Sequence, residues 1–483
     1  MKFSTLLAGM DIEVPEIEAC DLTLDSRWVK PGDAFVALAG GIAYLDDAVR
    51  RGAVAALVDA APPEPAPLPV IVVPDLRARL GELAGRFYGH PDRELTLIAV
   101  TGTDGKTSTT HYIAQALNAT GCRCAVIGTL GVGWPDHLVA EGNGLTTPDV
   151  ITLQRTLARL RAQGAQAVAL EASSHGLSQG RLDGVAIDVA GLTHLSRDHL
   201  DYHGSLEAYV AAKRRLFERS ELRVAVLNED CAFGRDCRSA LVPGVRVVAY
   251  TLADAPHADV TGRIASSDRH GLVLDMTCAG FSGRLETRLR GAFNGPNLLA
   301  ALGALLGLGV DVDRAIRTLG QVTPVPGRME LFCAPGRPLV ALDYAHTPNA
   351  LETVLRDFRT YVAGRIWCVM GAMGRRDRGK RPLMSEVAAR WADHIVLTDS
   401  LTHGEDPDAI IADLRSGLPS GAAVDVVHDR AAAIAYAVDH AGPEDGVFIA
   451  GTGKGNERES IDLNGQVVAS DYAHLSACLE VVS

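Results

Sequence analysis

The sequence has no apolar run long enough to cross a membrane as a helix, which argues against an integral membrane protein. Its opening residues, 1–7, have too short an apolar core for a secretory signal peptide. The nine cysteines have neither the paired spacing of a zinc site nor the even count of a disulfide framework. With a net charge of −13 at pH 7, the chain is poorly suited to bind nucleic acid or an anionic membrane surface. These absences predict a cytoplasmic protein with neither nucleic acid nor membrane as a partner.

The chain is long and alternates apolar runs with helical segments. Its 483 residues, 47% of them hydrophobic, can form several domains with substantial cores. Alternation of this kind predicts a mostly parallel sheet with helices on both faces. The expected strands of this central sheet are 97–100, 125–127, 167–170, 189–192 and 224–227.

A second series of apolar runs predicts a further, dinucleotide-fold-like α/β domain. These runs are 339–342, 366–370, 395–398, 424–427 and 447–450. The fold class is therefore α/β with three domains, whose expected limits are 1–91, 92–327 and 328–483. Residues 245–290 are turn-rich and are expected to form a smaller antiparallel excursion from the central sheet.

A glycine-rich turn between a predicted strand and a predicted helix is the first candidate for chemistry. It follows residues 97–100 and reads Thr101-Gly102-Thr103-Asp104-Gly105-Lys106-Thr107. Glycines let the backbone wrap closely around a phosphate, and a helix N-terminus offers free N–H groups. The pattern indicates a phosphate-binding loop in which Lys106 meets the terminal phosphates and Thr107 holds magnesium. A chance Gly-Lys-Thr is the alternative, because Val100 stands where the common pattern has its first glycine.

Polar residues also crowd at the ends of other predicted strands, where open α/β sheets bind their ligands. Glu171, directly after an apolar strand, suits a magnesium ligand, although an N-cap network for the next helix is the plainer interpretation. Residues 193–203 contain three histidines, two aspartates and an arginine, for which a zinc site is conceivable but lacks a supporting cysteine. Residues 342–348 and 371–377 indicate a nucleotide or substrate face in the third domain, or a polar surface.

Together these motifs resemble those of the Mur ligases, the ATP-dependent amide-forming enzymes of peptidoglycan assembly. The most specific strings are Thr146-Thr147-Pro148, Ser173-Ser174-His175-Gly176-Leu177, Asp198-His199-Leu200-Asp201-Tyr202-His203, Gly327-Arg328-Met329-Glu330 and Asp343-Tyr344-Ala345-His346-Thr347-Pro348. The resemblance covers nearly the whole chain and is closest to the MurE type. It implies a ligase that phosphorylates the D-Glu carboxylate of UDP-N-acetylmuramoyl-L-Ala-D-Glu with ATP. The acyl phosphate is then joined to an amino acid, so the partners are small molecules.

The resemblance also implies a role for each matching residue. Catalytic roles fall to Lys106, His199 and Lys213. ATP contacts fall to Gly102, Thr103, Gly105, Lys106, Thr107, Ser108, Asn294, Asn297, Arg328 and Asp343. The acyl substrate is expected at Ser26, Thr146, Thr147, Ser173, Gln179 and Arg181, and the amine at Arg376, His403, Gly453 and Glu457. Two magnesium ions are expected at Thr107, Glu171, His199 and Lys213, with Lys213 carbamylated so that a cation becomes an oxygen-bearing anion.

The chain departs from the family pattern where substrates are selected. The family's Asp-Asn-Pro-Arg string falls at Ser400-Leu401-Thr402-His403, and an imidazole cannot reproduce the two-pronged grip of arginine on the distal carboxylate of meso-diaminopimelate. The loop at 39–45, which touches uridine in the family, is shortened. Four single replacements are Asn456 for a histidine, Arg375 for an acidic residue, His194 for an asparagine, and Asp104 within the phosphate loop.

Three functions are compatible with this sequence. The first is a MurE-type ligase whose amine is lysine, ornithine or another amino acid. The second is a divergent Mur-like ligase that joins an amino acid to a different carboxylate in another pathway, such as secondary metabolism. The third, from another class, is a non-catalytic nucleotide-binding regulator.

Overall fold

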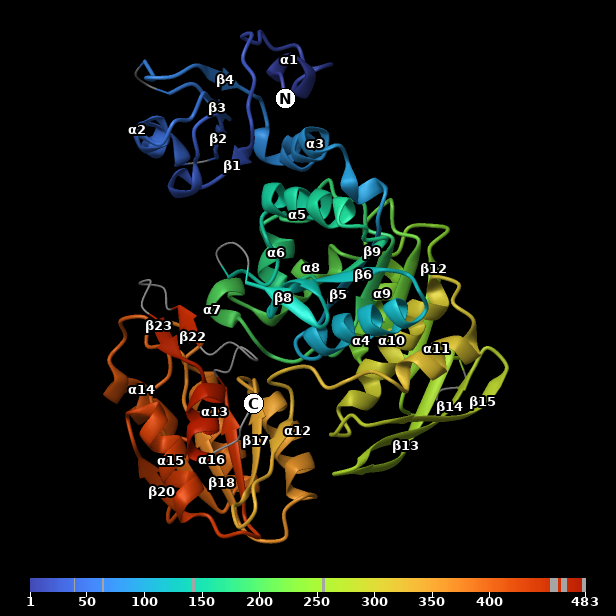
Figure 1. Ribbon diagram of the computed structural model, residues 1–483, viewed down its shortest axis with the longest axis vertical. Helices are drawn as coiled ribbons and strands as arrows, with labels where there is room; N and C mark the ends of the chain where they lie inside the picture. The colour runs from blue at the N-terminus through green and yellow to red at the C-terminus, as the bar shows by residue number, and fades with distance from the viewer. Residues whose placement is uncertain are drawn as a thin grey trace.

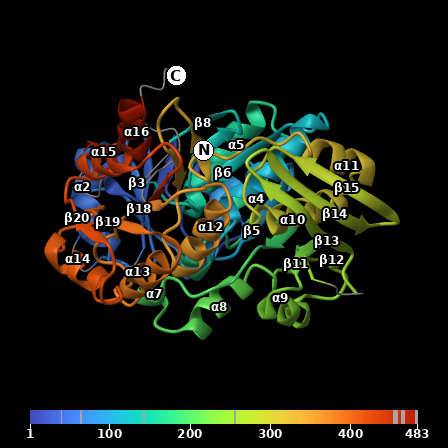
Figure 2. The same ribbon diagram turned by 90° about the horizontal axis from the view of Figure 1, so that it is seen from below.

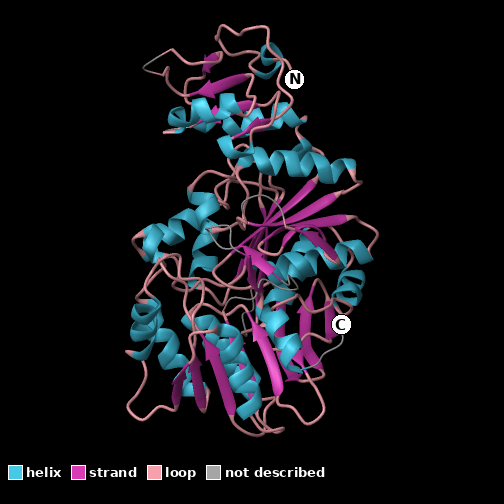
Figure 3. Ribbon diagram, turned by 60° about the vertical axis from the view of Figure 1, so that its left-hand side comes forward, coloured by secondary structure: helices cyan, strands magenta, loops and turns pink. Residues whose placement is uncertain are grey.

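Three α/β units follow one another along the long axis of the molecule (Figure 1). The computed structural model describes residues 1–38, 40–62, 65–140, 144–253, 257–451, 459–461 and 467–479. Each unit is built around its own sheet, and helices cover the sheets (Figure 3). The prediction of an α/β protein with three units is confirmed, while the limits 1–91, 92–327 and 328–483 stay predictions.

The N-terminal unit contains a parallel sheet in the order β1-β2-β3-β4. Its strands are β1 (Leu22–Thr23), β2 (Ala34–Ala37), β3 (Ala55–Val58) and β4 (Val70–Val72). Its helices are α1 (Phe3–Leu6), η1 (Ser26–Trp28), η2 (Gly41–Tyr44), α2 (Leu45–Arg50), α3 (Leu76–Tyr88) and η3 (Pro91–Arg93). Helix α3 packs against α5 (Val150–Ala162) of the central unit through the leucines of both helices, so the two units share one hydrophobic core.

The central unit has an eleven-stranded sheet in the order β15-β14-β13-β12-β11-β10-β5-β9-β6-β7-β8. Its strands are β5 (Thr96–Thr101), β6 (Cys124–Gly128), β7 (Gly131–Trp134), β8 (His137–Val139), β9 (Ala167–Glu171), β10 (Val189–Leu192), β11 (Val224–Asn228), β12 (Arg246–Thr251), β13 (Val260–Asp268), β14 (Gly271–Cys278) and β15 (Phe281–Thr287). Its helices are α4 (Lys106–Ala119), α5 (Val150–Ala162), α6 (Ser174–Ser178), α7 (Leu200–His203), α8 (Leu206–Arg214), α9 (Ala232–Cys237), η4 (Arg238–Ala240), α10 (Asn294–Gly307) and α11 (Val312–Leu319). The pairing is parallel from β6 to β13 and antiparallel at both edges.

The antiparallel strands β13–β15 confirm the excursion expected within residues 245–290, although β12 belongs to the parallel part. Strand residues alternate between two cores, because successive side chains point to opposite faces of a sheet. Ile98 and Val100 face α4 and α10, whereas Leu97 and Ala99 face the core that holds α5. Burial on both faces explains why these strands are continuous apolar runs in the sequence.

The C-terminal unit has a six-stranded sheet in the order β16-β17-β21-β18-β19-β20, parallel except for β16. Its strands are β16 (Glu330–Phe332), β17 (Leu339–Asp343), β18 (Ile366–Met370), β19 (His394–Leu397), β20 (Val424–Val426) and β21 (Gly446–Ala450), and a separate ribbon pairs β22 (Glu459–Ile461) with β23 (Val467–Ala469). Its helices are α12 (Pro348–Arg359), α13 (Lys380–Trp391), α14 (Pro407–Arg415), α15 (Arg430–His440) and α16 (Asp471–Leu479). Seen from below, this unit lies beside the central one (Figure 2). In the described part of the chain, no helix has the length and apolar character needed to cross a membrane.

Candidate active site

A cleft of about 1830 Å³ lies between the central and C-terminal units. Its walls are the loops that follow β5, β9, β10, β17 and β18, together with the β7–β8 hairpin. Because these loops leave the carboxyl ends of parallel strands, they meet at one edge of each sheet. All four polar clusters expected from the sequence therefore border the same cavity.

The phosphate loop links β5 to α4 and is held in place from the neighbouring strand. Gly102 has a φ of +150°, and a Cβ built on it would lie 1.9 Å from Thr193 Oγ1. Gly105 has a φ of +84°, and its Cβ would lie 2.3 Å from Asn297 Oδ1. Both positions exclude any side chain, so the glycines are required for this close approach.

The polar groups of this loop are arranged around the N-terminus of α4. Lys106 Nζ donates hydrogen bonds to the carbonyls of Gly102 and Thr103, at 3.0 and 2.8 Å. The Asp104 carboxylate accepts a hydrogen bond from Asn349 Nδ2 of α12, at 3.4 Å. A side chain of the C-terminal unit thus binds Asp104, whose negative charge is unusual in a phosphate loop.

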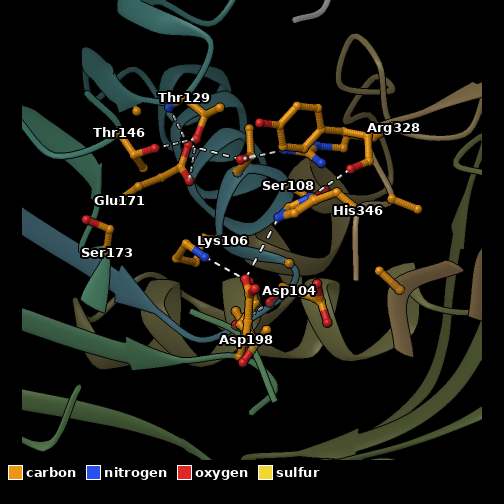
Figure 4. Close-up of a pocket in the computed structure, with 18 of the residues that line it drawn as sticks. Asp104, Lys106, Ser108, Thr129, Thr146, Glu171, Ser173, Asp198, Arg328 and His346 are labelled. Atoms are coloured by element: carbon orange, nitrogen blue, oxygen red, sulfur yellow. Dashed lines mark hydrogen bonds and ion pairs between the residues drawn. The ribbon is translucent and has the colours of Figure 1, made fainter. Parts of the chain in front are cut away.

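Glu171 joins the phosphate loop to the opposite wall of the cleft (Figure 4). Its Oε1 accepts hydrogen bonds from Thr107 Oγ1 at 3.0 Å and from the Thr129 N–H at 2.8 Å. Arg328 Nη2 donates to the same Thr107 hydroxyl at 3.0 Å. The carboxylate is therefore not the N-cap of α6, a role that Ser173 fills by accepting from the Gly176 N–H. Thr129 was not expected from the sequence, since nothing local marks it as a partner of Glu171.

Of the expected acyl-binding residues, Thr146, Ser173 and Arg181 line the cleft, whereas Thr147, Gln179 and Ser26 do not. Thr147 Oγ1 donates to the Glu171 carbonyl at 2.7 Å, and Thr146 lies 3.2 Å from the Thr129 hydroxyl. Arg181 donates to the Thr147 carbonyl at 2.7 Å and to Gln179 Oε1. Ser26 does not line the cleft, because it is buried in η1, where its hydroxyl faces Asp47. Two residues away Trp28, which is 59% exposed, reaches the cleft instead.

Lys213 is a buried amine, and one hydrogen bond of its side chain is found among the residues that the structure describes. Its side chain is 1% exposed, and Nζ donates to the Gly102 carbonyl at 2.7 Å. It also lies over the ring of Tyr209, whose hydroxyl is hydrogen-bonded to Thr103. Burial, assisted by the positive charge of Lys106, holds the pKa of Lys213 well below its ordinary value. The amine therefore reaches its neutral, nucleophilic form at a lower pH than a surface lysine does.

Asp198 connects the central unit to the C-terminal unit. Its side chain is 4% exposed and lies 3.5 Å from Lys380 Nζ, 3.8 Å from His346 Nε2 and 3.3 Å from His199 Nε2. Burial raises the pKa of Asp198, but the charge of Lys380 and the hydrogen bond from the His199 N–H act against it, and the net shift is downward, so the side chain stays a carboxylate. Burial lowers the pKa of His199 to about 3, so its imidazole is neutral at pH 7, the form that binds metals. Sequence reasoning missed Asp198, Lys380 and His346 as a cluster, because they are far apart in the chain.

The expected adenine and ribose residues form a buried group beside α4. Tyr112 donates to Asn294 Oδ1 at 2.9 Å, and Asn297 lies next to Asn294 at the start of α10. Asp343 accepts hydrogen bonds from the Met329 and Ala345 N–H groups, both at 2.8 Å. Burial raises the pKa of Asp343 to about 6, despite the opposing charge of Arg328. Asp343 therefore lines the cleft and also fixes the backbone at Met329, where the chain enters the C-terminal unit.

The side of the cleft where the amine was expected is formed by the loops after β18 and β19. Arg376 and His403 both line it, as expected from the sequence. The expected amine residues Gly453 and Glu457 lie outside the described residues. No group of three or more histidine, cysteine, aspartate or glutamate side chains within the described ranges forms a metal cage, which leaves the zinc interpretation of residues 193–203 unsupported.

Arg381 is a buried side chain that binds both the loop after β18, at the Met373 carbonyl, and the loop after β19, at Glu405. Its side chain is 1% exposed and donates to both oxygens of Glu405, at 2.7 and 2.8 Å, and to Asp413 at 2.8 Å. We expect Arg381→Met to lower the free energy of unfolding of the C-terminal unit by about 3 kcal/mol, because it removes the buried cation that two carboxylates share. The surface substitution Arg390→Met on the same helix is the control and should cost at most about 1 kcal/mol.

The same contact predicts how stability depends on pH. Arg381 lowers the pKa of Glu405 to about 2, so the folded state binds that proton less readily than the unfolded chain. The stability from Glu405 is therefore complete above pH 4.5 and is lost as the pH falls toward about 2. Urea unfolding at a series of pH values should show this loss in the wild type and a smaller loss in Arg381→Met. Parallel pH profiles would contradict the assignment.

The chain is similar to known proteins in both sequence and fold. The family model "Mur ligase middle domain" matches residues 100–305, and "Mur ligase, glutamate ligase domain" matches residues 327–453. The UDP-N-acetylmuramoyl-L-alanyl-D-glutamate–2,6-diaminopimelate ligase of Alkalilimnicola ehrlichii is 49% identical over 89% of this chain and 89% of its own length. The chain belongs to the Mur ligase family.

Further relatives support this membership. The ligase of the same name from Pseudomonas aeruginosa is 45% identical over 91% of both chains. A solved structure of a Mur ligase with that name superimposes with a TM-score of 0.69 at 35% identity, over 99% of both chains. The MurF structure from Acinetobacter baumannii shares only the fold, with a TM-score of 0.69 at 19% identity and coverage of 99% of this chain and 98% of its own.

Proposed function

We propose that this Mur ligase forms an amide bond between the D-Glu carboxylate of UDP-N-acetylmuramoyl-L-Ala-D-Glu and the amino group of an amino acid, at the expense of ATP. The observation that carries the proposal is the position of Glu171. Its carboxylate is hydrogen-bonded to Thr107 of the phosphate loop and to Thr129, which lies beside Thr146 on the acyl side. A phosphate donor and a carboxylate acceptor would therefore meet across one acidic side chain. We place the enzyme in the cytoplasm, with small molecules as its partners.

The phosphate loop fits the triphosphate of ATP. Gly102 and Gly105 leave no room for a side chain, no side chain caps the start of α4, and its first residues line the cleft. Lys106 Nζ is hydrogen-bonded to two carbonyls of the loop, so it would contact the phosphates that the loop would hold. Arg328, Asn297 and Asp343 line the same end of the cleft, where the base and ribose would lie.

Magnesium fits the oxygen-rich side of the cleft. The Thr107 hydroxyl and Glu171 carboxylate are 3.0 Å apart, and hard cations prefer such oxygens. His199 and a carbamylated Lys213 would serve a second ion. When bound, magnesium supplies positive charge that reduces repulsion between the acyl carboxylate and the triphosphate.

The residues of the chain then have defined tasks in two steps. In the first, the substrate carboxylate attacks the γ-phosphorus, the bond to the bridging oxygen breaks, and ADP leaves. Lys106 and Arg328 stabilise the negative charge of that transition state. In the second, the neutral amine attacks the acyl carbon, the bond from that carbon to the phosphate oxygen breaks, and phosphate leaves with the proton that the amine gives up. Asp198, Lys380 and His346 hold the two units together over the acyl phosphate, which limits its hydrolysis by water.

Purified protein, incubated with ATP, UDP-N-acetylmuramoyl-L-Ala-D-Glu and single amino acids, tests this proposal. We expect a product whose mass equals the sum of the two substrates minus one water, with one ADP and one phosphate released per product. The panel contains meso-diaminopimelate, L-lysine and L-ornithine. A control without the amino acid should release far less phosphate. Failure to form a product with any amine would refute the proposal.

A second candidate is a ligase that joins an amino acid to a different carboxylate. It is favoured by Ser400, Leu401, Thr402 and His403, which depart from the family string at a wall of the cleft. The same assay distinguishes the two candidates when other carboxylates are offered with the amine panel. Turnover with another carboxylate but not with the muramoyl dipeptide would establish the second.

A further inference from the structure

Asp104 is an acidic residue within the phosphate loop (Figure 4). Its backbone is fixed, because the Thr193 hydroxyl donates a hydrogen bond to the Asp104 carbonyl at 2.6 Å. The next residue, Gly105, lies so close to Asn297 that a Cβ built on it would be 2.3 Å from Oδ1. The Asp104 side chain is half-buried and lines the cleft. Its negative charge is therefore held on the cleft side of the loop, where a triphosphate would bind.

The fold does not neutralise the charge of Asp104. Its Oδ2 accepts a hydrogen bond from the neutral amide of Asn349, at the long distance of 3.4 Å. Lys106 and Lys213 donate to carbonyls of the loop instead. In the part of the chain that the structure describes, no lysine, arginine or histidine forms an ion pair with this carboxylate. Asp198, by contrast, has a lysine of the C-terminal unit at 3.5 Å. The charge of Asp104 is thus available to a cation from solution.

A carboxylate at this place acts differently on free nucleotide and on its metal complex. A negative charge about 5 Å from a phosphate, at the effective dielectric constant of a protein surface, weakens phosphate binding by about 10- to 100-fold. A divalent cation between the two anions changes this repulsion into attraction. Carboxylate oxygens suit magnesium, which proteins commonly bind through one or two carboxylates together with the phosphates of the substrate.

We propose that Asp104 makes nucleotide binding conditional on magnesium, because its carboxylate repels the free nucleotide and attracts the nucleotide–magnesium complex. Loss of magnesium after the reaction would then weaken the binding of ADP and promote its release. The role differs from that of Thr107, whose uncharged hydroxyl can serve the ion without repelling free nucleotide. This inference rests on the proposed function, in which the loop binds ATP.

Calorimetric titration of the purified full-length protein with β,γ-methylene-ATP tests the inference. Kd is measured in excess Mg²⁺ and in EDTA for the wild type, Asp104→Asn, Asp104→Ser and the control Glu386→Gln. Glu386 is an exposed residue of α13 outside the cleft, where it pairs with Arg390. In EDTA, both neutral variants of Asp104 should bind the nucleotide about 10- to 100-fold more tightly than the wild type. In Mg²⁺ they should bind it no more tightly than the wild type, and Glu386→Gln should match the wild type in both buffers.

Manganese provides a second measurement that does not depend on turnover. Because coupling between two ligands is reciprocal, the Mn²⁺ affinity of the nucleotide complex should fall in both neutral variants by the factor by which their metal dependence falls. Electron paramagnetic resonance of free Mn²⁺ measures that affinity, and thermal melting verifies that each variant is folded.

Two results would overturn the inference and leave the proposed function intact. One is a Kd that changes equally in the two buffers, or in neither, when Asp104 is neutralised, since the residue would then at most shape the loop. The other is a wild type whose affinity for the nucleotide does not depend on Mg²⁺. A wild type that binds no nucleotide in either buffer would refute the proposed function and the inference with it.

Discussion

Replacement of Lys213 by methionine is expected to reduce ATP-dependent amide formation by about 10³-fold. The side chain is 1% exposed, and methionine fills its volume without leaving a cavity. Burial and the charge of Lys106 depress the pKa of Lys213, so its neutral amine can attack CO₂ and lose a proton to give a carbamate. The variant would then lack both that anion and the hydrogen bond to the Gly102 carbonyl. Coupled detection of ADP and product mass measures the loss.

Carbamylation has a spectroscopic test that does not depend on turnover. Wild-type protein in ¹³C-bicarbonate should show a carbamate signal in ¹³C NMR, and Lys213→Met should lack it. The exposed Lys30→Met is the matched control and should keep both the signal and the rate. An unchanged rate in Lys213→Met would contradict a catalytic role and would favour the regulator, whose biological activity would survive this substitution.

Local sequence patterns predicted the parallel strands and the phosphate loop well. The expected strands at 189–192 and 366–370 coincide with β10 and β18, because both are apolar runs buried on both faces of a parallel sheet. The hairpin β7–β8 was not predicted. Its strands are only four and three residues long, and β7 contains Gly131 and Gly133 at positive φ, so the hairpin lacks the β-branched alternation that marks a strand.

The candidate site was predicted where its members belong to motifs and missed where they depend on tertiary contact. Thr129 meets Glu171 only because β6 lies beside β9 in the sheet. Asp198 meets Lys380 only because the third unit faces the second across the cleft. Ser26 belongs to a motif and yet does not line the cleft, since its hydroxyl turns toward Asp47 within the N-terminal unit. Motif spacing therefore predicted which loops border the cleft, while tertiary contacts determine which side chains meet there.

Replacement of Lys106 by methionine is expected to lower kcat/KM for ATP by at least about 10³-fold, with most of the loss in kcat. Lys106 begins α4, and the loop carbonyls of Gly102 and Thr103 hold its ammonium at 3.0 and 2.8 Å. From there it can stabilise charge on the transferred phosphoryl group, which grows in the transition state. A contact that strengthens in the transition state acts on kcat more than on the affinity for ATP.

Equilibrium binding of ADP separates this role from a structural one. Since the helix N-terminus and both glycines remain in Lys106→Met, its affinity for ADP should fall by less than about 10-fold while turnover is lost. Lys106→Arg keeps the charge on a differently shaped group, so we expect its rate to lie between those of the wild type and Lys106→Met. If ADP affinity and kcat fell by the same factor in Lys106→Met, the lysine would be holding the nucleotide rather than the transition state.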